Sequence, residues 1–451
     1  MHNSHSDSSG RSSLVVFWTT AKPAFALHYP EPTMKAHIQR LNFLFLFSLL
    51  LLPVFAQEPE AEVSTVTRPI EKQVRRTFEF KEDRVYFSNE FDGARANKIE
   101  KDVTGRFVIT ITPENSPINP SPWYAFKVWS KKKKDIQVRL VYPEPARHRY
   151  NPKTSPDGLT WTTLDPAFVV EEEKGTGTGV VDSLPRSITM TLRTGKKPLW
   201  VSAQEIQTSK HVNAWMNATA KNGGFQIEEI GKSRDGRVMR MLKIGNLNSR
   251  RMILVISRQH PPEVTGYFAM QAFAETVANG TELSHAFRQN WGIYVVPLMN
   301  PDGVDEGHWR HNQGGVDLNR DWSDFNQPET QLVRDFLNRR EAETGGKFYF
   351  GIDFHSTWND IYYPMSPIYE GNAPRLIPRW IENIREAIPN YEPRIQPSPR
   401  LLPTRVSRNH FFDKHGMEAI VFEIGDNTPR DFIRKKGEVG AVELMKLLNV
   451  R

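Results

Sequence analysis

The sequence predicts an α/β fold with a mixed, mostly parallel sheet flanked by helices, preceded by an antiparallel β-sandwich domain. Two patterns support this. Short runs that alternate apolar and polar residues fill residues 76–204, while compact apolar strands alternate with helical patterns over residues 205–451. The change of pattern near residue 205 indicates a domain boundary there.

The first 75 residues are expected to lie outside both domains. Residues 34–56 have Lys35 and Arg40, then an apolar run, then a small residue at Ala56. This pattern is typical of a secretory signal peptide cleaved after Ala56, although a buried helix or membrane anchor is the alternative. Residues 1–33 then look like an upstream extension and residues 57–75 like a linker, so the mature protein is expected to be secreted or periplasmic, with no membrane span.

The β-domain is predicted from runs with a period of two, separated by Pro, Gly and Asn turns. Its clearest strands are 106–112 (RFVITIT), 123–129 (WYAFKVW), 135–142 (DIQVRLVY) and 187–193 (SITMTLR). The lysine run Lys131–Lys134 falls between two of these strands. A solvated hairpin turn is favoured for it over an anion-binding site.

The second domain is predicted from buried-looking strands separated by amphipathic helices. Strands are expected at 251–257 (RMILVIS), 292–298 (GIYVVPL), 347–354 (KFYFGIDF) and 419–424 (AIVFEI). Helices are expected from near Glu263 to Gly280 and around 328–341, 375–388 and 432–448. No internal repeat is visible.

Composition narrows the chemistry. The 451 residues carry a formal charge of +7 and contain no cysteine, which excludes disulfides, thiol nucleophiles and cysteine-ligated zinc. No Lys/Arg-rich segment with interleaved aromatic residues suggests a nucleic-acid surface, so nucleic acid is not an expected partner. The sequence gives no signal for an oligomeric state.

Three ionisable clusters follow predicted strands, where α/β sheets bind ligands. His260 and Glu263 follow the strand ending at Ser257, His355 follows residues 347–354, and Glu423 ends the last strand. Two imidazoles and a carboxylate form the ligand set of a catalytic zinc site, and the remaining glutamate could act as a base. Taken alone, His260 and Glu263 could be a chance pair on a turn stiffened by two prolines, and His355 a packed histidine.

The stretch NPDGVDEGHWRHNQGGVDLNRDW at 300–322 makes the pattern specific. Asn300–Gly303 is followed by Arg310, then Asp317–Arg320, with His355 and Glu423 further along. This order resembles the zinc carboxypeptidase family over about residues 205–448. The layout is closest to the cytosolic carboxypeptidase (deglutamylase-like) branch, which has a similarly placed β-domain.

The resemblance implies a role for each matching residue. His260, Glu263 and His355 would bind one Zn²⁺ per chain. Further roles would be general base for Glu423, oxyanion stabilisation for Arg310, binding of the substrate's terminal carboxylate for Asn319 and Arg320, and orientation of a ligand imidazole for Asp317. The alternative to these functional roles for Asp317 and Arg320 is a structural ion pair between them.

One departure concerns substrate positioning. Classical family members have a tyrosine about twenty residues before the catalytic glutamate, but residues 396–422 contain none. The same region carries Arg405 and Arg408, in the part of the family fold that lines the pocket for the C-terminal side chain. These arginines could select an acidic C-terminal residue, or they could lie on a solvated loop.

The expected activity is therefore that of a zinc metallocarboxypeptidase acting on peptides or peptidoglycan stems. Two alternatives remain open at this stage. One is a zinc amidase or deacylase acting on small N-acyl amino acids or muropeptides, and the other is a binding protein without turnover. A complete set of ligands and base argues against the latter.

Overall fold

The computed structural model describes residues 64–174, 183–223, 225–397 and 405–449. The predicted upstream extension, the signal peptide and residues 57–63 of the predicted linker lie outside these ranges. Across the described ranges, no helix combines the length and apolar character needed to cross a membrane.

The N-terminal part of the described chain forms two β-sheets. The six-stranded sheet has the order β1-β2-β5-β11-β7-β8, with β1 (Thr77–Phe80), β2 (Val85–Ser88), β5 (Ala125–Ser130), β11 (Leu199–Ser202), β7 (Lys153–Ser155) and β8 (Thr162–Thr163). The five-stranded sheet has the order β3-β4-β6-β10-β9, with β3 (Lys98–Lys101), β4 (Phe107–Thr110), β6 (Lys134–Val141), β10 (Pro185–Thr194) and β9 (Val169–Lys174). Fully buried residues from both sheets, among them Phe126 and Val138, pack into one apolar core.

Two details differ from the predicted antiparallel domain. Strands β4 and β6 pair in parallel, because the intervening β5 belongs to the other sheet and the chain crosses back before β6 begins. The lysine run connects β5 to β6, so it is a turn between sheets rather than a hairpin. Lys131, Lys132 and Lys133 are exposed there, as expected for a solvated turn.

The C-terminal part is built on a seven-stranded mixed sheet with the order β12-β13-β15-β14-β16-β18-β17. Its strands are β12 (Gln226–Lys232), β13 (Val238–Gly245), β14 (Arg251–Ser257), β15 (Gly292–Val296), β16 (Lys347–Thr357), β17 (Ile361–Pro364) and β18 (Glu418–Gly425). The four central strands, β15, β14, β16 and β18, run parallel, and the strands outside them are antiparallel.

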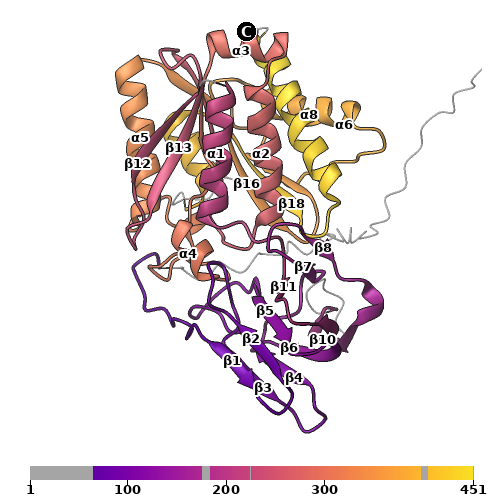
Figure 1. Cartoon of the computed structure of the whole chain (residues 1–451). Coiled ribbons are helices and arrows are strands. Elements are labelled where there is room, and N and C mark those ends of the chain that lie inside the picture. The colour runs from indigo at the N-terminus through magenta and orange to yellow at the C-terminus, as the bar shows by residue number, and fades with distance from the viewer. Residues whose placement is uncertain (1–63, 175–182, 224, 398–404, 450–451) are drawn as a thin grey trace, which may run out of the picture. The chain divides into compact units, whose positions relative to one another are not determined.

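Helices cover both faces of this sheet (Figure 1). They are α1 (Ser209–Gly223), α2 (Val264–Ala278), α3 (Glu282–Asn290), α4 (Pro301–Glu306), α5 (Pro328–Thr344), α6 (Leu376–Ala387), α7 (Ser407–His415) and α8 (Arg430–Asn449). One core joins α1, α2, α3, α6 and α8 to the sheet, and a second core joins α5 and α7 to the opposite face. In β14, Ile253 and Val255 belong to the first core and Met252, Leu254 and Ile256 to the second. Burial on both faces explains why this strand is an unbroken apolar run.

The three strands that carry the candidate residues are neighbours, with β14 beside β16 and β16 beside β18. Ser257 is in register with Phe354, and His355 is in register with Glu423. Strand β16 extends to Thr357, beyond the predicted end at Phe354, because its pairing with β18 continues to that residue. The parallel arrangement therefore brings the C-terminal ends of all three strands to one edge of the sheet.

Candidate metal centre

The turn between β14 and α2 carries the first two candidate ligands. Pro261 and Pro262 lie between His260 and Glu263, and their fixed φ angles restrict the turn. Glu263 occupies the cap position of α2. Both candidate ligands are buried, so the turn presents them to the interior rather than to solvent.

The stretch Asn300 to Arg320 lies against this turn. The side chain of Asn300 caps α4, and its Nδ2 donates to the Gln259 carbonyl at 3.2 Å. Further along, Asp317 Oδ1 accepts the Asn319 N–H at 2.9 Å and starts a short 3₁₀ turn. These local caps fix where the polar side chains of the stretch point.

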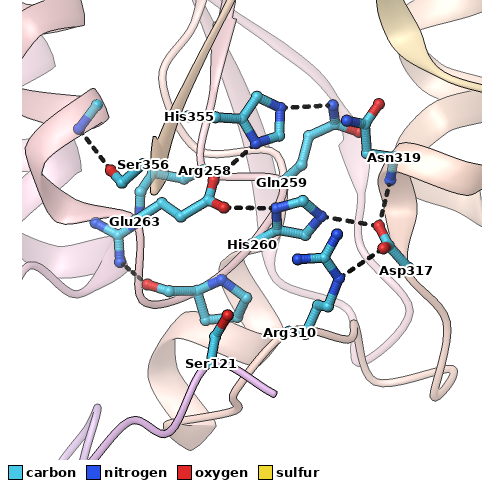
Figure 2. Close-up of polar contacts among 12 residues, drawn as sticks. Ser121, Arg258, Gln259, His260, Glu263, Arg310, Asp317, Asn319, His355 and Ser356 are labelled. Carbon is cyan, nitrogen blue, oxygen red and sulfur yellow. Dashed lines mark hydrogen bonds and ion pairs between the residues drawn. The ribbon is translucent and has the colours of Figure 1, made fainter. Parts of the chain in front are cut away.

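His260, Glu263 and His355 bring their donor atoms together (Figure 2). His260 Nδ1 lies 2.7 Å from Glu263 Oε1, and His355 Nδ1 lies 2.8 Å from Glu263 Oε2. One donor atom from each of the three residues falls within a common distance of 4.8 Å. Both imidazoles thus direct the same nitrogen, Nδ1, toward one point.

The other nitrogen of each imidazole is held by a carboxylate. His260 Nε2 lies 2.8 Å from Asp317 Oδ1, and His355 Nε2 lies 2.9 Å from Asp353 Oδ2. A carboxylate at Nε2 fixes the ring orientation and favours the tautomer whose Nδ1 is free to bind a metal. Asp317 therefore lies where the resemblance implies it should.

Asp353 was not predicted from the sequence, yet it is central to this arrangement. Its Oδ2 accepts from Gln259 Nε2 and from Ser407 Oγ, each at 2.5 Å, in addition to its contact with His355. A signal existed in the spacing Asp-x-His, since residues two apart on a strand share a face.

The arrangement fits a zinc ion. Two imidazole nitrogens and one carboxylate are the protein ligands of many catalytic zinc sites, which keep a fourth position for water or substrate. In such sites a carboxylate commonly accepts a hydrogen bond from the imidazole nitrogen that does not bind the metal, as Asp317 and Asp353 are placed to do here. The His-Glu-His cluster therefore has both the donor set and the outer hydrogen bonds that zinc requires.

The imidazole and carboxylate groups of the cluster shift one another's pKa. Burial raises the pKa of Glu263, but the charges of His260 and His355 outweigh it and hold that pKa well below its usual range. For His355, burial lowers the pKa, yet Asp353 and Glu263 together raise it well above its ordinary value. A zinc ion would take the place of protons between these groups, because metal ligands bind in their deprotonated forms.

Glu423 stands beside the cluster on the neighbouring strand. Its Oε2 is buried and has no hydrogen-bond partner among the described residues. Burial raises the pKa of Glu423 to about 7, with Glu263 adding to the shift and His355 opposing it. A bound zinc ion would lower this pKa again through its positive charge. An unpartnered carboxylate oxygen next to a metal site is placed to exchange protons with a bound molecule.

The cluster opens into a cleft of about 440 Å³, lined by His260, Glu263, His355 and Glu423 together with Arg310, Asn319 and Arg320. Arg310 Nε donates to Asp317 Oδ2 at 2.7 Å, which ties this arginine to the outer partner of His260. Arg320 donates to the Asn319 carbonyl at 3.0 Å. With Arg147 and Arg149, four arginines thus line the cleft together with the metal cluster and Glu423.

Residues 212–394 match the family model described as zinc carboxypeptidase. The chain carries a zinc carboxypeptidase domain. The matched range contains His260, Glu263, Arg310 and His355, while Glu423 lies beyond it and is brought to the site by β18.

Two relatives match part of this chain. An uncharacterized protein of Zymomonas mobilis is 26% identical over 271 residues, which cover 58% of this chain and 64% of that protein. Cytosolic carboxypeptidase 2 of Danio rerio is 31% identical over 117 residues, 25% of this chain and 16% of its own length. This chain thus spans less than two thirds of either relative.

A solved structure extends the likeness beyond the zinc carboxypeptidase domain. The crystal structure of a metallo-carboxypeptidase from Burkholderia cenocepacia superposes with a TM-score of 0.66 at 16% identity, covering 81% of this chain and 99% of that chain. This coverage is larger than residues 212–394 alone, so the β-domain belongs to the shared fold.

The β-domain contributes to the cleft of the zinc carboxypeptidase domain, which the sequence did not predict. Arg149 lines the cleft, and its Nε donates to Asp426 Oδ2 at 2.6 Å. Its terminal nitrogens donate to the Ser356 carbonyl and to Ser121 Oγ, each at 3.1 Å. Because these partners are far apart in sequence, no local pattern could have revealed their contact.

Of the two predicted selector arginines, Arg408 contacts Tyr363 at the cleft. Tyr363, on β17, lines the same cleft as Glu423. Burial raises the pKa of Tyr363, and the negative charge of Glu423 raises it further. Arg408 is buried on α7 and donates to the Tyr363 carbonyl at 3.1 Å. Arg405 is partly buried, and its carbonyl accepts from the Trp322 N–H at 3.2 Å. Neither arginine is among the residues that line the 440 Å³ cleft.

Proposed function

We propose that this protein is a zinc-dependent metallocarboxypeptidase that removes the C-terminal residue of peptides or peptidoglycan stems. The observation that supports this most is the convergence of His260, Glu263 and His355 beside Glu423, in a cleft that also holds Arg310 and Arg320. The residues proposed to hydrolyse the peptide bond and the arginines proposed to bind negatively charged groups of the substrate therefore line the same cleft.

Zinc, when bound, supplies a Lewis acid that activates water and polarises the scissile carbonyl. Glu423 takes a proton from the attacking water and passes it to the leaving amine, the task of a general base that then acts as an acid. Arg310 offers a fixed positive charge to the oxyanion that develops on the carbonyl.

Selection of the chain end is assigned to Asn319 and Arg320. A guanidinium group offers parallel N–H donors that match the two oxygens of a terminal carboxylate. Both residues line the cleft next to the metal cluster, so a carboxylate bound there would place the adjacent peptide bond near Glu423. An internal peptide bond has no such carboxylate, which makes the proposed reaction an exopeptidase reaction.

The Glu423→Gln variant tests the proposed base. Its amide cannot accept the proton, so kcat should fall by roughly 10²- to 10⁴-fold, the usual contribution of a general base. The zinc content of the purified variant, measured by elemental mass spectrometry, should stay at one ion per chain because Glu423 is not a proposed ligand. Unchanged peptidase activity in this variant would remove Glu423 from the mechanism.

We further propose a preference for an acidic C-terminal residue, with Arg405 and Arg408 as candidate selectors. Arg408 is supported by its hydrogen bond to the carbonyl of Tyr363, a residue that lines the cleft. Two peptides that differ only in a C-terminal Glu or Gln isolate the charge. Selective loss on the Glu peptide in Arg405→Ala or Arg408→Ala identifies the selector, with the exposed Arg379→Ala as control.

Export follows from the proposed signal peptide at residues 34–56. The mature protein would begin at Gln57 and act outside the cytoplasm. N-terminal sequencing of the exported protein tests this, and a start within residues 1–33 would overturn it.

A further inference from the structure

Glu114 belongs to the β-domain, in the loop after β4. Its side chain is completely buried and contacts the loop at residues 309–315, which carries Arg310. Its carboxylate accepts three successive backbone N–H groups of that loop. The Trp309 N–H donates to Oε2 at 2.7 Å, and the N–H groups of Arg310 and His311 donate to Oε1 at 3.0 and 2.6 Å. One carboxylate therefore holds the backbone on both sides of Arg310.

The neighbouring residue strengthens the same attachment. Asn115 Oδ1 lies 2.6 Å from His311 Nδ1, and Asn115 Nδ2 donates to the Gly315 carbonyl at 3.1 Å. From the chain preceding β1, the Arg68 N–H donates to the Gly314 carbonyl at 2.8 Å. The loop at residues 309–315 is thus bonded along its length to residues from outside the zinc carboxypeptidase domain.

The loop leads directly into the metal site. The Arg310 side chain donates to Asp317 Oδ2 at 2.7 Å, and Asp317 Oδ1 contacts His260 Nε2 at 2.8 Å. Figure 2 shows Arg310 and Asp317 lying together against His260. A displacement of the loop backbone would therefore move the guanidinium group relative to the metal cluster.

The negative charge of Glu114 strengthens its hydrogen bonds to the backbone of residues 309–311. Burial raises its pKa, but the charges of His308, His311 and Arg95, together with the His311 N–H, outweigh burial and lower that pKa to about 2. Three backbone N–H donors and the nearby Arg95 favour the ionised carboxylate. Hydrogen bonds from backbone N–H groups to an ionised carboxylate are about twice as strong as those between neutral groups.

We propose that Glu114 is a positioning residue for catalysis: it fixes the backbone of the Arg310 loop so that the Arg310 guanidinium meets the developing oxyanion. The β-domain then contributes directly to the catalytic apparatus. This inference rests on the proposed function, because it assigns Glu114 to the same reaction through Arg310.

The test uses Glu114→Gln in the full chain. Glutamine has the same shape, but its NH₂ group faces N–H donors and cannot accept from them, so part of the attachment is lost. Misplacing the Arg310 guanidinium should lower kcat by up to about 100-fold. KM should change little, because Asn319 and Arg320 still bind the substrate carboxylate, and zinc content should remain at one ion per chain.

Two further variants separate positioning from general damage. Glu172→Gln removes a β-domain carboxylate that bonds to Arg139 and Thr189 of the same domain, so it should leave kcat unchanged. Glu114→Asp keeps the charge but is one methylene shorter, and should lose less kcat than Glu114→Gln. In an Arg310→Ala background, Glu114→Gln should cause no further loss, because its effect acts through Arg310.

Equal losses with and without Arg310, or a wild-type kcat in Glu114→Gln, would overturn the proposal. Amide hydrogen exchange of residues 309–311 gives a readout that does not need turnover. Faster exchange at these amides in Glu114→Gln than in Glu172→Gln is expected, and unchanged protection would refute the attachment. If the wild-type protein releases no C-terminal residue, the proposed function fails, while hydrogen exchange still decides the role of Glu114 in holding the loop.

Discussion

The Asp353→Asn variant is expected to weaken zinc binding while leaving every proposed ligand in place. Asp353 is completely buried, and its Oδ2 accepts from Gln259, from Ser407 and from His355. Its Oδ1 has no partner among the described residues. An asparagine could keep its oxygen at the Oδ2 position, but its NH₂ group would then occupy the Oδ1 position without an acceptor.

The expected size follows from these contacts. The variant removes the negative charge that orients and polarises His355, and losing such an outer partner costs about 10- to 100-fold in metal affinity. This range corresponds to about 1.4 to 2.8 kcal/mol of binding free energy. Because Asp317 still supports His260, the site should retain zinc rather than lose it altogether.

Competition with a chromophoric chelator at pH 7 measures the change. Asp135→Asn serves as a control, since the Asp135 side chain pairs with the highly exposed Arg193 at 3.0 Å and belongs neither to the cleft lining nor to the metal cluster. Wild-type affinity in Asp353→Asn would refute the idea that the carboxylate behind His355 tunes the site. An equal loss in Asp135→Asn would assign the effect to general instability.

Three further outcomes follow from the packing. A Cβ at Gly266 would lie 2.3 Å from the His355 carbonyl oxygen, so Gly266→Ala should reduce both the unfolding temperature and the zinc affinity. Wild-type values of both would contradict this close packing of Gly266 against His355. Removing Arg149 leaves Asp426 buried without its partner, so Arg149→Met should lower the free energy of unfolding by about 3 to 5 kcal/mol. Urea denaturation measures this change, and a loss below about 1 kcal/mol would contradict the prediction. Burial raises the pKa of Glu329 to about 7 from 4.5, so the folded state keeps this proton while the unfolded state loses it. The free energy of unfolding should therefore fall by about 3 kcal/mol between pH 4.5 and 7, and Glu329→Gln should abolish that part of the pH dependence, whereas parallel curves for both proteins would exclude it.

The strands that carry the site could be predicted because burial on both faces makes them continuous apolar runs, as in β14 and β18. The edge strand β12 and its neighbour β13 were missed, since their partly exposed residues give a weak pattern. The parallel pairing of β4 with β6 was also missed, because it depends on which sheet β5 joins.

The candidate site divides in the same way. His260, Glu263, His355 and Glu423 stand out because they follow or end predicted strands, in an order typical of one family. Glu114 and Arg149 act through contacts with residues distant in the sequence, and an ordinary carboxylate or arginine in a loop gives no local signal for such contacts, whereas the Asp-x-His spacing of Asp353 was a local signal that was overlooked. The roles of Glu114 and Arg149 emerge only from the folded arrangement.

Product analysis tests the central claim most directly. A defined peptide is incubated with zinc-loaded protein and with protein stripped of metal by a chelator, and the products are identified by mass spectrometry. The proposed function predicts that only the zinc-loaded protein releases a single free C-terminal amino acid, leaving a peptide shortened by that residue. Internal fragments, loss of an acyl group without a released terminal residue, or equal release by the stripped protein would contradict it.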